Sequence, residues 1–160
     1  MSSTLNTKGS AMSHEERNNI ASLVAGLLVN IYVIAKLANL FGDGRLDGAD
    51  AAMVWARAML WVIPIGIATV IICIILGNIL FAIAERDPKP SFVVDERDEA
   101  IKIFGMRFTM VIVSVAFMGG LVALALGAKP LIVFIGMFFG FSFGDLIGNF
   151  VKLIRYRHDI

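Results

Sequence analysis

Four long apolar segments divide this sequence and constrain its fold more than any other feature. They run from about residue 20 to 41, 55 to 84, 101 to 127 and 130 to 154. Each reaches the roughly 20 residues that a helix needs to cross about 30 Å of hydrocarbon. Because lipid offers no partner for backbone N–H and C=O groups, segments that span a bilayer as single elements must be helical. The sequence therefore predicts a polytopic, all-α membrane protein with four transmembrane helices.

The composition agrees with a membrane protein and argues against several other classes. Hydrophobic residues make up 58% of the 160 residues and charged residues only 17%, whereas a soluble domain needs more polar surface. The formal net charge of +1 does not point to nucleic acid as a partner. Cys73 is the only cysteine, and His14 and His158 lie near opposite ends of the chain, which argues against a disulfide framework and a zinc site.

Signals at the segment boundaries refine the predicted domain. Ser13 and Glu16 have the spacing of a capping box, and Pro130 suits the first position of a helix. Trp55 and Trp61 suit a membrane interface, where an indole is half apolar and half hydrated. We predict a disordered extension at 1–12 and one transmembrane domain at 13–160, with helices at about 14–41, 53–84, 97–127 and 130–155.

Lysine and arginine residues predict the orientation. Ten of them precede the first segment, lie in or beside the connection between the second and third, or follow the fourth: Lys8, Arg17, Arg86, Lys89, Arg97, Lys102, Arg107, Lys152, Arg155 and Arg157. The other side has Arg45, Arg57 and Lys129, and Lys36 can snorkel there. The positive-inside rule assigns the ten to the cytoplasm. We therefore expect an antiparallel bundle with cytoplasmic N- and C-termini in a bacterial-type inner (cytoplasmic) membrane.

Glycines recur every four residues in the fourth segment, at Gly136, Gly140, Gly144 and Gly148. On a helix they form a narrow strip that lets another helix approach closely, and close packing drives association in lipid. We predict a glycine-zipper interface, either within the bundle or between subunits. A pore lined by this strip is the alternative.

Polar residues share another side of the same helix, within about 80° on a helical wheel: Ser142, Asp145, Asn149 and Lys152. Asp145 is the one acid clearly inside an apolar segment, and Arg107 enters the third segment at a comparable depth. Ionisable groups at such depths usually face protein or water and have a partner. We predict that Asp145 and Arg107 form an intramembrane polar pair. The alternative is a site that handles ions or protons.

The connection between the second and third segments ends in a charged run, Asp95-Glu96-Arg97-Asp98-Glu99. Acids are favoured in the first turn of a helix by the helix dipole, and Asp95 and Asp98 can cap free N–H groups. We predict that this run starts the third helix. A docking surface for a basic partner and a divalent-cation site are the alternatives, although carboxylates alone do not make a specific metal site.

Three short motifs resemble an uncharacterised family of small bacterial four-helix membrane proteins. They are Asp95-Glu96-Arg97-Asp98 followed by Ile101, the opening Met12-Ser13-His14-Glu15-Glu16-Arg17, and the ending Leu153-Ile154-Arg155-Tyr156-Arg157. The resemblance covers roughly residues 12–160. It implies that the Asp-Glu-Arg-Asp motif of the cytoplasmic loop is a family feature, and it brings no established activity.

Known catalytic patterns are missing from the sequence, which has no Gly-rich phosphate loop, no Ser/His/Asp set and no His pair at ligand spacing. We therefore expect no enzyme activity, no catalytic, cofactor-binding or metal-binding residues, and no cofactor. The expected partners are the lipid bilayer and other membrane protein subunits or the chain itself, not nucleic acid. The leading hypothesis is a protein that acts through helix–helix association, as an accessory subunit or a homo-oligomer. The alternative is a small ion- or proton-coupled transporter or channel that uses Asp145 and Arg107.

Overall fold

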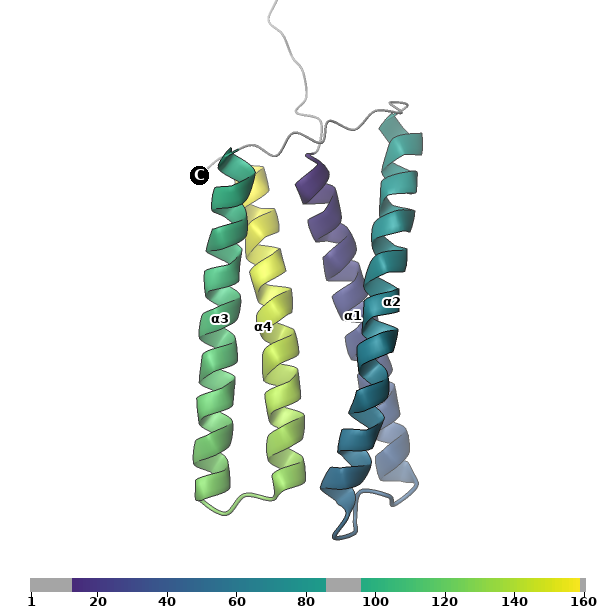
Figure 1. Ribbon diagram of the computed structural model, residues 1–160, viewed down its shortest axis with the longest axis vertical. Coiled ribbons are helices and arrows are strands. Elements are labelled where there is room, and N and C mark those ends of the chain that lie inside the picture. The colour runs from purple at the N-terminus through teal and green to yellow at the C-terminus, as the bar shows by residue number, and fades with distance from the viewer. Residues whose placement is uncertain (1–12, 86–95, 159–160) are drawn as a thin grey trace, which may run out of the picture.

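The computed structural model describes residues 13–85 and 96–158, and it has four helices within these ranges (Figure 1). They are α1 (His14–Gly42), α2 (Ala51–Glu85), α3 (Glu96–Ala125) and α4 (Pro130–His158). Each is long and apolar enough to cross a membrane, judged by length and composition. The predicted all-α class with four candidate membrane-spanning helices is confirmed. The predicted extension at 1–12 lies outside the described residues.

The helix ends follow the local signals in the sequence. Ser13 is the N-cap of α1, and its Oγ accepts a hydrogen bond from the Glu16 N–H at 3.1 Å. Pro130 is the first residue of α4. Gly44 and Gly127 have φ angles of +67° and +86° in the two short connections, a conformation that side chains with a Cβ rarely adopt.

Contacts between the helices run in the order α3, α4, α1, α2. α3 packs against α4 and α1 against α2, while the contact between α1 and α4, with a smaller one between α2 and α4, joins the two pairs (Figure 1). Over the described ranges, α2 and α3 share no packed face, so the array is open between its outer helices. The connections at 43–50 and 126–129 lie at one end of the molecule, here called the turn end. The other end, where α1 and α3 begin and α4 finishes, is called the terminal end.

The apolar core lies near the turn end, between α1, α2 and α4. Its buried members are Val33, Leu40, Leu46, Ala51, Trp55 and Val62, and Phe138 and Phe139 of α4 pack against them. Trp55 is only 2% exposed and meets the Phe138 ring edge-on, with centroids 6.1 Å apart. Trp61 is 70% exposed. Trp61 therefore has the exposure expected of a tryptophan at a membrane interface, whereas Trp55 faces the core.

Most of the surface of α2 and α3 is apolar and exposed. In the most hydrophobic stretch of each helix, only 6% of the residues are buried. Large side chains such as Leu60, Ile83 and Val115 point outward there. A soluble monomer rarely exposes so much contiguous apolar surface, which is the surface expected to face lipid or a partner.

Candidate functional site

The α3–α4 contact uses three of the four glycines of the predicted strip. A Cβ added at Gly144 would lie 3.3 Å from side chains of Ile112 and Val113, and one at Gly140 would strike Ala116. At Gly148 it would strike the Thr109 side chain and lie 3.0 Å from the Gly105 carbonyl oxygen. The fourth glycine, Gly136, is exposed and has nothing within 4 Å of such a Cβ.

α3 contributes glycines to this contact that the sequence analysis did not identify. A Cβ on Gly105 would meet the Lys152 side chain and lie 2.8 Å from the Gly148 carbonyl oxygen, and one on Gly120 would lie 2.6 Å from Met137 Sδ. The sequence does contain a sign of this contact, because small residues recur at helical spacing on α3: Gly105, Thr109, Ala116 and Gly120. Because α3 covers Gly140, Gly144 and Gly148, these residues are not free to form an interface between subunits.

Polar side chains join α1 to α4. The Asn30 amide donates hydrogen bonds to Ser142 Oγ at 2.7 Å and to the Gly26 carbonyl oxygen at 2.8 Å. Nearer the terminal end, the Asn19 amide donates to the Asn149 carbonyl oxygen at 2.8 Å, and both residues are buried. Such bonds hold helices together where water is absent. From the middle of the helices to the terminal end, hydrogen bonds therefore contribute to the contact between the two helix pairs, together with Leu146, which packs against Gly26.

Asp145 belongs to a chain of polar groups along α4. The Asn149 side-chain amide donates to Asp145 Oδ2 at 3.1 Å, and Lys152 Nζ donates to Asn149 Oδ1 at 2.8 Å. Asn149 thus links the carboxylate to a cation, with its amide N–H on the acid and its carbonyl on the ammonium group. Asp145 itself is exposed, so this single hydrogen bond leaves acceptor capacity on the carboxylate.

A groove of about 440 Å³ surrounds the Asp145 side chain, and three helices line it. Its lining residues are Ser22, Gly26 and Val29 of α1, Gly66 and Val70 of α2, and Ser142, Asp145 and Asn149 of α4. A second hollow of about 110 Å³ shares Ser22 and Asn149 with it and reaches residues near the terminal end, including Glu15 and Lys102. Polar residues therefore line both the hollow near the terminal end and the groove at Asp145, and the apolar core lies on the turn side.

The structure does not bring Asp145 and Arg107 together. Arg107 is exposed and lies about 200° around α3 from Gly105, which faces α4. Asp145 lines the groove toward α1 and α2 instead. Within the described residues no ion pair joins these two side chains. The predicted intramembrane pair therefore has no geometric support within one chain, because the two residues share a depth but lie on different sides of their helices.

The Asp-Glu-Arg-Asp motif lies at the start of α3, and Asp95 falls outside the described residues. Asp98 is buried, accepts a hydrogen bond from Ser13 Oγ at 3.4 Å and also interacts with the Tyr156 hydroxyl. Arg97 donates to the Tyr156 carbonyl oxygen at 3.5 Å, while Glu96 is exposed. The motif thus provides acids for the first turn of α3 and ties α3 to the ends of α1 and α4.

The groove offers a bound molecule one carboxylate, together with hydroxyl and amide groups. Among the described residues, no group of three or more His, Cys, Asp or Glu side chains could hold a metal ion. The groove suits a hydrogen-bond donor or a cation, because Asp145 is the only charged residue in its lining. No family model, curated protein or solved structure matches this chain, so no activity or partner is transferred to it from a relative.

Proposed function

We propose that the protein is a non-enzymatic integral membrane protein of the cytoplasmic membrane that acts through helix–helix association. In this proposal it is an accessory subunit, and a transmembrane helix of its partner enters the groove at Asp145. The observation that carries the proposal is the exposed Asp145 carboxylate in a groove that α1, α2 and α4 line. Association with a second copy of the chain is the other form that the proposal allows.

The depth of Asp145 gives the physical reason. The residue lies 15 positions after Pro130, or about 22 Å along α4, just past the middle of the helix. A carboxylate exposed to hydrocarbon at such a depth costs about 2.5–3.5 kcal/mol on insertion scales. Asn149 supplies one hydrogen-bond donor. A partner helix that brings another donor or a cation would remove most of the remaining cost.

The distribution of cations supports a cytoplasmic terminal end. Arg17 lies in the first turns of α1, Arg97 and Lys102 at the start of α3, and Arg155 and Arg157 at the end of α4. The turn end has fewer cations. By the positive-inside rule, the terminal end faces the cytoplasm and the two short connections face the opposite side.

Site-directed photo-crosslinking in native membranes tests the proposal. A photoreactive residue at Val70, which lines the groove, should give a discrete adduct that mass spectrometry identifies. The matched control is the same residue at Ile71, one position along α2 and 52% exposed. Asp145→Asn should weaken the adduct at position 70. Adducts of equal yield at both positions, or at neither, would contradict the proposal.

One alternative, a small ion- or proton-coupled transporter or channel, is favoured by the polar residues that line both the groove at Asp145 and the hollow near the terminal end. The apolar core on the turn side opposes it, because a transport path must reach both faces. Flux measurements on purified protein in vesicles separate the two functions. Loss of an ion or proton flux in Asp145→Asn, with thermal stability unchanged, would support transport over association. Arg107, which that hypothesis also uses, lies outside the groove.

A further inference from the structure

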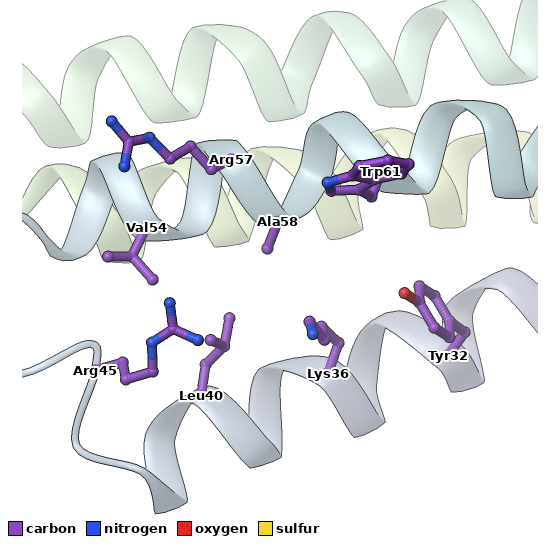
Figure 2. A pocket seen from close by; sticks show the side chains of 8 residues that line it. All are labelled: Tyr32, Lys36, Leu40, Arg45, Val54, Arg57, Ala58 and Trp61. Atoms are coloured by element: carbon purple, nitrogen blue, oxygen red, sulfur yellow. The ribbon is translucent and has the colours of Figure 1, made fainter.

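A hollow between α1 and α2 near the turn end is lined by three cations and no acid (Figure 2). Its volume is about 240 Å³, and its lining comes from α1, the following connection and α2: Tyr32, Lys36, Leu40, Arg45, Val54, Arg57, Ala58 and Trp61. Figure 2 shows Lys36 and Tyr32 projecting from α1 and Arg45 from the connection, with Trp61 across from Tyr32 on α2. We call this hollow the basic pocket.

Nearby acids do not enter the basic pocket. Asp43, Asp47 and Asp50 lie in the same connection, but all three are exposed and none lines the hollow. The Asp47 carboxylate lies over Gly44, 3.5 Å from the position that a Cβ would take there. Three like charges around one hollow repel one another, so a bound anion would stabilise the pocket.

The position of the basic pocket suits the edge of a membrane. Lys36 lies six residues before the end of α1 and Arg57 six residues after the start of α2, each about 9 Å along its helix. Trp61 is 70% exposed beside them. Aromatic residues and snorkelling cations at this depth meet the lipid headgroups.

We propose that the basic pocket binds the phosphate group of an anionic phospholipid in the leaflet around the turn end. The guanidinium groups of Arg45 and Arg57 can bind phosphate oxygens in pairs, and Lys36 adds a third positive charge. Exposed apolar side chains such as Leu60 and Ile34 lie on the same two helices, nearer their middles than the cations, and can contact the acyl chains. The inference rests on the membrane insertion proposed above, but it is independent of the groove at Asp145.

Three cations also determine which lipid is favoured. A phosphatidylglycerol headgroup has a net negative charge, whereas phosphatidylcholine brings a quaternary ammonium that the same cations would repel. Native mass spectrometry of the full chain in mild detergent, titrated with each lipid, measures the difference. We expect the wild type to bind phosphatidylglycerol about tenfold or more tightly, and the triple variant Lys36→Gln/Arg45→Gln/Arg57→Gln to lose this preference.

Matched variants test whether the lipid preference comes from the basic pocket or from the positive charge of the protein in general. Lys129→Gln removes an exposed cation from the other connection at the same end and should keep the preference, because Lys129 does not line the basic pocket. If the triple variant has lost helical content by circular dichroism, Arg45→Gln alone provides the test, with a smaller expected loss. The proposal would be overturned if the triple variant kept the preference for phosphatidylglycerol, or if Lys129→Gln lost it to the same extent.

A soluble phosphate ester tests whether the bound phosphate belongs to a lipid or to a free phosphate compound. Glycerol 3-phosphate in millimolar excess should not displace phosphatidylglycerol, because it lacks the acyl chains. If it displaces the lipid completely, the basic pocket is a site for a free phosphate compound and the lipid proposal is wrong. If neither lipid is preferred while the chain still inserts in vesicles, the lipid inference fails and the proposed function is unaffected.

Discussion

α4 packs against its neighbours in two different ways. Toward α3, Gly140, Gly144 and Gly148 bring the helix backbones close together, with no room for a Cβ at Gly140 or Gly148 and little at Gly144. Toward α1 and α2, polar side chains and an open groove surround Asp145. The glycine face therefore fixes the fold, whereas the polar face retains space and hydrogen-bonding capacity for another molecule.

The polar face of α4 also changes along its length. Near the turn end, Phe138 packs against the buried Trp55 in the apolar core. From the middle of the helices to the terminal end, here called the polar half, Asn30 and Asn19 join α1 to α4 through hydrogen bonds. We infer that the apolar half holds the two helix pairs together, and that the polar half contributes less to stability and more to recognition.

The largest expected effect is at Trp55. Replacing this 2%-exposed residue by alanine removes the ring that packs on Phe138 and leaves a cavity in the apolar half. Trp55→Ala should lower the free energy of unfolding by about 3–5 kcal/mol, measured by denaturation in detergent. Trp61→Ala, at a 70%-exposed site on the same helix, is the control and should change stability little. If both variants lost the same free energy of unfolding, the apolar half would not be the main source of stability.

A smaller effect is expected on the glycine face. Gly148→Leu forces a side chain against Thr109 and the Gly105 carbonyl oxygen, and the backbone atom cannot move out of the way as a flexible side chain could. The free energy of unfolding should fall by about 1–3 kcal/mol. Gly136→Leu adds the same side chain where nothing lies within 4 Å and should be close to neutral. A larger loss in Gly136→Leu than in Gly148→Leu would show that α3 does not cover the strip as described.

The helices and several of their ends were predictable because their causes are local. Apolar length predicts the spans, and Ser13 and Pro130 occupy the N-cap and first-turn positions that their chemistry favours. The glycine strip was also visible at a spacing of four residues. Gly136 departs from it because the contact with α3 continues through Met137 and Val133, which meet Gly120, and leaves Gly136 off this face of α4.

The candidate site was only partly predictable, because helix rotation depends on packing and not on depth. The helical wheel predicts Asp145 and Asn149 on one side of the helix, and the structure shows them hydrogen-bonded. A similar depth in the sequence favours a pair between Asp145 and Arg107. Depth does not reveal that Gly105, two residues before Arg107, faces α4 and leaves Arg107 on the far side of α3. The same reason explains Trp55, which lies near the turn end but faces inward.

The smallest effect should appear in the polar half, at the hydrogen bond between Asn30 and Ser142. Its length is 2.7 Å, and it joins α1 to α4 across the boundary between the two helix pairs. A double-mutant cycle with Asn30→Ala and Ser142→Ala should give a coupling energy of about 0.6 kcal/mol, the average for such bonds between membrane helices. The value is small because a polar side chain released inside a membrane protein usually finds another acceptor, and Asn30 already donates to the Gly26 carbonyl oxygen.

The control for this cycle is the pair Asp145→Asn and Arg107→Gln in the same detergent. These side chains have opposite formal charges and similar depth, but Arg107 faces away from α4, so their losses should add with no coupling beyond error. A coupling that exceeds the one between Asn30 and Ser142 would mean that α3 is rotated from the orientation seen here, or that Arg107 of a second copy reaches Asp145. Repeating the cycle at protein concentrations that differ tenfold separates the two, because only a contact between copies strengthens with concentration.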